Sequence, residues 1–259
     1  MYIDSHCHLD FSVFDPQRQM LMQHCQDQHI TGFLVPATTY ASWKPLALLA
    51  QKFPQWRTAY GLHPYFLATA NKSEVALLGD WCENHDSLAV GEIGLDNWPG
   101  SVDMAVQIDF FNAQLNVAKA IKRPVILHAR KSYDLVLKSL RETTFEHGGI
   151  VHAFNGSLVQ AKRFIDYGFV LGVGGTITYP RAQKALRVLA CLKDSDFVLE
   201  TDSPDMPLHG FQGQNNTPLA VPLIAEQVAQ VRGQTKELVA HYTYNNLLRV
   251  FPQWHKDSL

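Results

Sequence analysis

Histidines and carboxylates of the kind that bind metal ions recur along this chain. His6 and His8 are separated by a single residue, and side chains two apart on an extended strand face the same side, so these two imidazoles can chelate one ion. Cys7 between them should point the other way, into the packing. The other candidate ligands are Glu92, His128, His152 and Asp202. Imidazole favours zinc, iron, manganese or nickel, and carboxylates favour harder ions.

The number of these ligands indicates catalysis rather than a structural ion. A structural zinc ion takes about four ligands, whereas the six candidates fit two ions that share a carboxylate and keep open positions for water and substrate. One ion would lower the pKa of the attacking water, and the other would stabilise the charge that develops on the substrate. We predict a two-metal hydrolase that binds zinc, with manganese or magnesium as alternative ions.

The elements that must position these residues are short apolar runs separated by longer amphipathic stretches. Eight runs predict strands, at residues 2–6, 32–36, 57–61, 88–93, 124–128, 149–153, 169–173 and 197–201. Helical patterns separate the strands, at residues 16–29, 42–53, 72–85, 102–121, 131–142, 157–167 and 181–192, and two more follow at 218–231 and 236–251. Strands that alternate with helices indicate a parallel sheet, and eight of them favour closure into a TIM (β/α)8 barrel.

All six candidate ligands lie at the carboxyl ends of predicted strands. His6 and His8 close the first strand, and the others lie at the ends of the fourth, fifth, sixth and eighth, in the order Glu92, His128, His152, Asp202. In a barrel these ends meet at one mouth, where the active sites of this fold lie. We therefore expect the six side chains to converge in one pocket, with the long loop 203–217 beside it.

Composition bounds the class of protein. A length of 259 residues allows one barrel or two small domains, and the strand count favours a single domain over residues 1–259. The net charge of −2 gives no global attraction to nucleic acid or to an anionic membrane, so a phosphate-bearing substrate would need local cations or metal ions. Scattered cysteines, a polar start and the lack of a long apolar run predict free thiols and a cytoplasmic location.

Six short stretches of the sequence resemble the TatD family of metal-dependent hydrolases, many of which are described as deoxyribonucleases. The stretches are residues 4–10 (DSHCHLD), 61–64 (GLHP), 91–96 (GEIGLD), 124–128 (PVILH), 151–154 (VHAF) and 199–204 (LETDSP). Together they extend the resemblance from residue 2 to about residue 250, and the sequence looks close to the YjjV branch of the family. The resemblance implies a barrel of the metallo-dependent hydrolase type.

The resemblance also implies a role for each site residue. One metal ion would be held by His6, His8 and Asp202, a second by His128 and His152, and Glu92 would bridge the two. Asp202 and Glu92 would be the catalytic carboxylates, with Asp202 as the general base that orients or deprotonates the attacking water.

Two further residues would bind the substrate if the resemblance holds. His63 would touch substrate near the mouth, or else pack as a loop histidine against Pro64. Arg130 would grip a phosphate through its fork of donors, or else cover the barrel rim.

The chain also departs from the nuclease members of the family. Lys131 and Ser132 follow Arg130, where those members have an acidic residue, and residues 210–218 contain no cation where those members tend to be basic. The loss of a basic loop argues against tight binding of long DNA and leaves the metal chemistry untouched.

These features favour hydrolysis of phosphodiester bonds in DNA or small nucleotides as the leading function. Trp98, Tyr65 or Phe66 could stack a base at the mouth. The alternative is hydrolysis of carbon–nitrogen or ester bonds, as in cyclic amidases and lactonases on the same scaffold, although those relatives commonly bridge their ions with a modified lysine rather than a glutamate such as Glu92. A non-catalytic metal-binding scaffold is the third possibility. We expect no membrane contact and no obligate protein partner, so that a monomer suffices.

Overall fold

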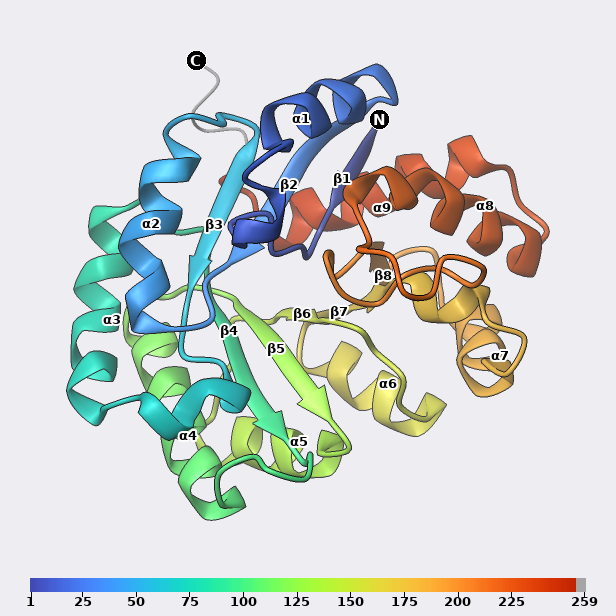
Figure 1. The fold of residues 1–259 in the computed structure, drawn as a ribbon. Coiled ribbons are helices and arrows are strands. Elements are labelled where there is room, and N and C mark those ends of the chain that lie inside the picture. The colour runs from blue at the N-terminus through green and yellow to red at the C-terminus, as the bar shows by residue number, and fades with distance from the viewer. Residues whose placement is uncertain (255–259) are drawn as a thin grey trace.

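The computed structural model describes residues 1–254, and its strands form one parallel sheet in chain order from β1 to β8 (Figure 1). The strands are β1 (Tyr2–Asp4), β2 (Ile30–Pro36), β3 (Trp56–Tyr60), β4 (Ala89–Asp96), β5 (Val125–Arg130), β6 (Gly149–Val151), β7 (Phe169–Val173) and β8 (Phe197–Leu199). Every adjacent pair is parallel. The predicted alternation of strands and helices is therefore confirmed, and the last five residues of the predicted domain 1–259 lie outside the described residues.

Helices surround the strands (Figure 1). They are α1 (Arg18–Asp27), α2 (Tyr40–Ala50), α3 (Lys72–Asn84), α4 (Met104–Ala120), α5 (Tyr133–Glu142), α6 (Leu158–Asp166), α7 (Gln183–Cys191), α8 (Val221–Arg232) and α9 (Lys236–Val250). Short 3-10 turns include η2 (Pro64–Thr69) and η3 (Gly175–Thr178). None of the helices within residues 1–254 is long and apolar enough to span a bilayer.

The barrel closes where the last strand meets the first. Ser5 N–H donates to the carbonyl of Leu199, and Asp202 N–H donates to the carbonyl of His6. Asp4 strengthens this seam, because its carboxylate accepts from the backbone N–H of Thr201 at 3.0 Å and from the Thr201 hydroxyl at 2.5 Å. Backbone hydrogen bonds thus join the segment of His6 and His8 to the segment that carries Asp202.

One apolar side chain from each strand fills the interior of the barrel. This interior cluster is made by Ile3, Leu34, Ala59, Ala89, Ile126, Ile150, Val170 and Val198. Leu247, Phe251 and Trp254 at the end of the chain belong to the same cluster and close the barrel at the amino ends of the strands. Trp254 packs on Gly32, where an added Cβ would lie 2.7 Å from the indole ring. This end of the barrel is therefore packed shut.

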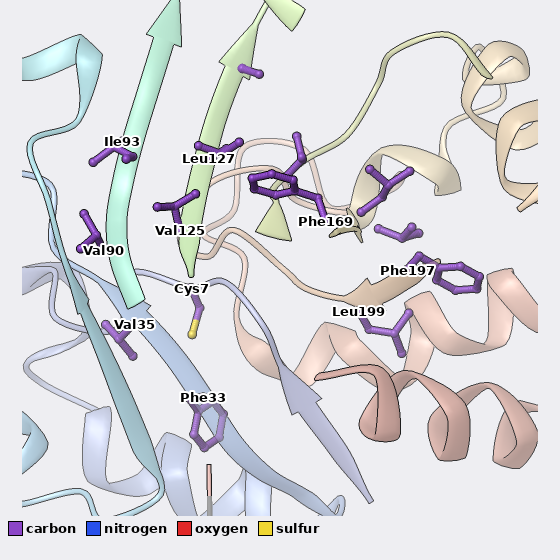
Figure 2. Close-up of a cluster of buried hydrophobic side chains, with 14 of the residues drawn as sticks. Cys7, Phe33, Val35, Val90, Ile93, Val125, Leu127, Phe169, Phe197 and Leu199 are labelled. Carbon is purple, nitrogen blue, oxygen red and sulfur yellow. The ribbon is translucent and has the colours of Figure 1, made fainter. Parts of the chain in front are cut away.

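The alternate strand residues face outward against the helices. Figure 2 shows part of this outer cluster, in which Cys7 lies with Phe33 and Val35. The Cys7 thiol is fully buried, and its Sγ lies 3.8 Å from the carbonyl oxygen of Leu34. The expectation that Cys7 points into the packing is confirmed, and all four cysteines of the chain are unpaired.

Beyond this apolar interior cluster, the next inward positions of the last four strands are mostly polar. In β5 to β8, strict alternation leads from the interior residues to His128, His152, Gly172 and Glu200. A barrel strand contributes inward side chains at every second position, so these residues form the next layer toward the carboxyl ends of the strands. The site is built on this layer.

Candidate metal centre

The carboxylate of Glu92 lies at the centre of a cluster of imidazoles. Its side chain is 1% exposed, and five histidine rings approach within 3.5 Å of one or the other of its oxygens. The distances are 3.3 Å from Oε2 to His6 Nε2, 3.5 Å from Oε2 to His8 Nε2, 3.3 Å from Oε1 to His63 Nε2, and 3.0 Å from Oε1 to both His128 Nδ1 and His152 Nε2. Histidines from four separate segments of the chain therefore meet at the one carboxylate of Glu92.

Asp202 completes the cluster on the side of the barrel seam. Its Oδ1 lies 3.4 Å from His6 Nε2 and 3.6 Å from His8 Nε2. The backbone of Asp202 is in the left-handed region, with φ at 55°. Aspartate tolerates this conformation better than most residues do, and such positions are common at functional sites. All six candidate ligands from the sequence thus come together at the carboxyl ends of the strands.

A bulge in β4 turns Glu92 into the barrel. Val90 pairs with Val125 and Ile93 pairs with Leu127, so Gly91 and Glu92 together oppose the single residue Ile126. A bulge of this kind inserts one extra residue and redirects a side chain. Glycine at position 91 leaves the necessary room, because an added Cβ would lie 2.7 Å from the Cβ of Ile126.

Hydrogen-bond contacts behind the rings orient two of the imidazoles, and a third ring lies near a buried carboxylate. His8 Nδ1 lies 3.3 Å from the carbonyl of Pro36, which leaves Nε2 to face the carboxylates. His128 Nε2 lies 3.0 Å from Asp96 Oδ2, and His152 Nδ1 lies 3.8 Å from Glu200 Oε1. Partners of this kind orient the histidines of metal sites.

The sequence patterns assigned no role to Asp96 or Glu200. Both are buried, and they lie in the stretches GEIGLD and LETDSP. Alternation from Val198 predicts that Glu200 faces inward, whereas Asp96 faces inward only because of the bulge in β4. In the structure Asp96 lies beside His128, and Glu200 lies beneath His152.

Glu200 occupies space that is left open by two glycines, Gly172 in β7 and Gly174 directly after this strand. Its Oε1 accepts from the backbone N–H of Ala153 at 2.5 Å, and its Oε2 is buried with no hydrogen-bond partner. A Cβ at Gly172 would lie 2.0 Å from that Oε2, and a Cβ at Gly174 would lie 3.4 Å from the Glu200 Cγ. Gly172 is therefore required by the side chain of Glu200 rather than by its own backbone.

Gly172→Ala should destabilise the protein by about 1–3 kcal/mol, the usual cost of overpacking a close-packed interior. Gly79→Ala is the matched control, because a Cβ there meets Val117 at an ordinary 3.5 Å on a helix. That control should gain up to about 1 kcal/mol from helix propensity. Urea unfolding of both variants measures the difference. Wild-type stability in Gly172→Ala would show that Glu200 does not depend on this space.

The charges of the cluster favour two ionised carboxylates. Burial would raise the pKa of Glu92, but the surrounding histidines, with His152 first among them, hold it well below its ordinary value. The same competition between burial and neighbouring histidines lowers the pKa of Asp202 to about 2. Burial opposes charging of His128, but its hydrogen bonds with Asp96 and Glu92 raise its pKa to about 9. A bound cation would therefore compete with imidazole protons for the same lone pairs.

The donor set fits a metal ion of borderline softness. The ligand atoms form three groups, and within each group they lie within 4.8 Å of one another. The groups are His6 with His152 and Asp202, His6 with His8 and Glu92, and His63 with Glu92 and His128. Both ring nitrogens of His6 are buried without a hydrogen-bond partner. Buried polar atoms normally find partners, so orphaned imidazole nitrogens beside carboxylates suit a metal ligand.

The structure places the two predicted substrate residues differently. His63 lies inside the cluster, with its Nε2 3.3 Å from Glu92 Oε1, and burial lowers its pKa to about 4. Its Nδ1 accepts from the backbone N–H of Tyr65 at 3.1 Å. Arg130 lies at the rim, where its guanidinium stacks 3.7 Å from the centre of the Trp98 ring. Both residues line the mouth, and their roles remain predictions.

A cleft of about 900 Å³ opens over the cluster. Glu92, Asp202 and four of the five histidines line its floor. Phe11, Tyr65 and Phe66 form one aromatic side of the opening. The rest of the opening carries the positive charges of Arg130, Lys131 and Lys184 and the carboxylate of Asp205. A cleft of this size, with polar groups converging at its base, has the form of a substrate site.

Comparisons with known proteins agree with this geometry. The model of the family described as TatD related DNase matches residues 3–252. The uncharacterised metal-dependent hydrolase YjjV of Escherichia coli is 36% identical over 252 residues, which cover 96% of this chain and 97% of that protein. A protein of Erwinia billingiae named 3'-5' ssDNA/RNA exonuclease TatD is 29% identical over 251 residues, covering 94% of this chain and 96% of that one.

The crystal structure of E. coli YjjV, a TatD homologue, superposes with a TM-score of 0.93 and covers 97% of this chain and 98% of that one. Its fold is therefore shared over almost the whole length, at 36% sequence identity. The family model, these relatives and the barrel mouth described above lead to one assignment: this chain belongs to the TatD family of metal-dependent hydrolases.

Proposed function

We propose that this protein is a two-metal phosphodiesterase that cleaves DNA or small nucleotides. One observation carries the proposal: a buried carboxylate, Glu92, lies within 3.5 Å of five imidazoles, with Asp202 beside it at the floor of an open cleft. A purely structural ion would need fewer ligands and no cleft. Relatives that carry an exonuclease name support the choice of substrate.

The chain offers enough ligands for two ions around one shared carboxylate. We assign His6, His8 and Asp202 to one ion, His128 and His152 to the other, and Glu92 to both. His63 lies near enough to Glu92 and His128 to replace His152 in the second group. Zinc suits this imidazole-rich set best, and manganese or magnesium are the alternatives.

The ions would supply Lewis acidity, which activates a water molecule and polarises the phosphoryl oxygen. The residues of the chain do the rest. Asp202, ionised and 15% exposed at the cleft floor, orients the attacking water and receives its proton. Arg130 binds a non-bridging phosphate oxygen, and its stacking on Trp98 holds the guanidinium in place before the substrate arrives. Tyr65 and Phe66, both exposed at the mouth, stack against a base.

The reaction class can be tested with two substrates in parallel. The metal-loaded protein is incubated with end-labelled, short single-stranded DNA and with bis(4-nitrophenyl) phosphate. We expect hydrolysis of both, and the ladder of DNA products distinguishes attack at an end from internal cutting. If neither diester is cleaved while both ions are bound, the proposal is rejected, and lactones and cyclic amides become the substrates to test.

His63→Ala should keep both metal ions and lower kcat/KM by about 10- to 100-fold, because His63 would act on the substrate rather than as a ligand. His241→Ala removes an imidazole that is exposed on α9 and serves as the control. Metal analysis and kinetics are measured on the same preparations. Loss of one ion in His63→Ala would instead make His63 a ligand, and unchanged kinetics would remove it from the site.

A further inference from the structure

A second pocket adjoins the cleft on the side of α7. It has a volume of about 510 Å³ and lies between the start of α7, Tyr179 and the loop after β8. Four residues line both the pocket and the cleft, namely Asn155, Thr176, Lys184 and Met206. A ligand in the cleft could therefore extend into this pocket without leaving the surface of the protein. The sequence alone predicts only a helix over residues 181–192.

The lining of the pocket is positively charged. Arg181 and Lys184 line it, and none of its lining residues is acidic. Within residues 1–254, neither cation has a carboxylate within salt-bridge distance. An unpaired pair of cations in a concave site concentrates positive potential, which attracts anions.

Contacts within the chain hold both cations over the pocket. Lys184 Nζ donates to the carbonyl of Asn155 at 3.2 Å, which leaves two of its protons free for a ligand. Arg181 lies 5.3 Å from the centre of the Tyr179 ring. The Tyr179 hydroxyl in turn donates to the carbonyl of Pro207 at 2.8 Å, so the ring is fixed between two loops. Contacts with the loops that line the pocket thus position both cations.

The start of α7 adds to the same field. Ala182 precedes the helix and gives no side-chain acceptor to its first backbone N–H groups. Free N–H groups at a helix start favour an anion. This contribution supports the two cations and would not define a site without them.

We propose that this pocket binds a backbone phosphate of a nucleic acid strand whose scissile phosphate lies in the adjoining cleft. The inference rests on the proposed function and adds that the preferred substrate carries at least two phosphates in sequence. Two anion sites in one continuous depression match the repeating phosphates of a strand better than they match a small monoanionic ester. The loop 210–218 contains no cation, and Arg181 and Lys184, which follow β7, would supply the positive charge that binds the strand.

The test compares substrates of increasing length, in which each step adds one nucleotide and with it one backbone phosphate. The kcat/KM is measured for the thymidine dinucleotide, trinucleotide and tetranucleotide and for bis(4-nitrophenyl) phosphate. The wild type should gain at least about tenfold between the dinucleotide and the tetranucleotide, the effect of one charge-assisted contact. Arg181→Ala/Lys184→Ala should lose this gain. Arg181→Ala alone, at a residue that lines the pocket and not the cleft, should cleave the aryl diester at the wild-type rate.

The control removes two positive charges from α6 and α7 at positions outside the pocket. Lys162 on α6 and Arg187 on α7 are exposed and line neither the pocket nor the cleft. Lys162→Ala/Arg187→Ala should keep the gain with chain length. An equal loss in both double variants would overturn the proposal, because it would indicate only the long-range effect of net charge. A full gain in Arg181→Ala/Lys184→Ala would overturn it as well.

A binding measurement separates this inference from the proposed function. Fluorescence anisotropy with labelled hexathymidylate is recorded in EDTA, so that no cleavage occurs. Arg181→Ala/Lys184→Ala should weaken binding about tenfold and reduce the salt dependence of log K by about 1. If the wild type cleaves no diester, the proposed function fails while this readout still decides the pocket. Wild-type affinity and salt dependence in that variant would reject the phosphate site.

Discussion

Asp202→Asn is expected to lower kcat for phosphodiester hydrolysis by about a thousandfold without unfolding the protein. Asparagine keeps the size of the side chain and tolerates the left-handed backbone at this position, where φ is 55°. It removes the negative charge that faces His6 and His8 and the group that would accept the proton of water. The barrel seam is made by the backbone N–H of this residue, which the substitution retains.

The measurement is steady-state hydrolysis of bis(4-nitrophenyl) phosphate and of end-labelled DNA, with thermal unfolding as the check on folding. Asp80→Asn is the control: the same chemical change in an exposed carboxylate on α3, at a residue that does not line the cleft. Its rate should stay within a few-fold of wild type. An Asp202→Asn protein that retains a tenth of the wild-type rate would exclude Asp202 as the general base.

Glu92→Gln is expected to weaken metal binding by more than about a hundredfold and to abolish hydrolysis. Loss of a residue that only supports a ligand costs 10- to 100-fold in metal affinity, so loss of a shared ligand should cost at least as much. The amide cannot supply two anionic oxygens to rings that approach from both sides, such as His6 at 3.3 Å and His128 at 3.0 Å.

Metal content is measured by elemental analysis after gel filtration, and affinity by competition with a chelating dye. Glu83→Gln on the exposed face of α3 is the control and should bind as the wild type does. A full complement of ions in Glu92→Gln would contradict the bridging role. Loss of only one ion would restrict Glu92 to a single ligand group.

Much of the architecture could be predicted because the strands obey a simple period. The run 169–173 matches β7 at both ends, and apolar residues two apart in β5 to β8 lead directly to His128 and His152. Convergence of distant residues then followed from the geometry of a parallel barrel. Strand ends were less predictable. The first strand stops at Asp4 rather than at residue 6, and α1 begins at Arg18 because residues 15–17 form a turn.

The orientation of Glu92 could not be predicted from alternation. Ala89 faces the interior, so a regular strand would place Gly91 inside and Glu92 outside with Val90. Only the bulge opposite Ile126 reverses this order. His6 and His8 present the same problem, because regular alternation from Ile3 would bring Cys7 inward. Local breaks in the strand period, which carry no strong sequence signal, therefore build the site.

The positive pocket beside the cleft was also beyond the sequence patterns. Arg181 and Lys184 appear in the chain as ordinary residues at the start of an amphipathic helix. Their significance depends on Tyr179 and Pro207, which belong to different loops and meet only in the folded barrel. Charge counted along the chain cannot identify such a site.

The seam between β1 and β8 has a consequence for how the protein is made. A ribosome releases His6 and His8 first, and Asp202 leaves it only when most of the chain has been synthesised. The backbone bonds from Ser5 to Leu199 and from Asp202 to His6 can form only after that. A nascent or truncated chain therefore cannot assemble the full ligand set, whatever metal the cell supplies. Because its ligands lie on both sides of the seam between β1 and β8, this hydrolase is inactive until the ribosome has translated the eighth strand.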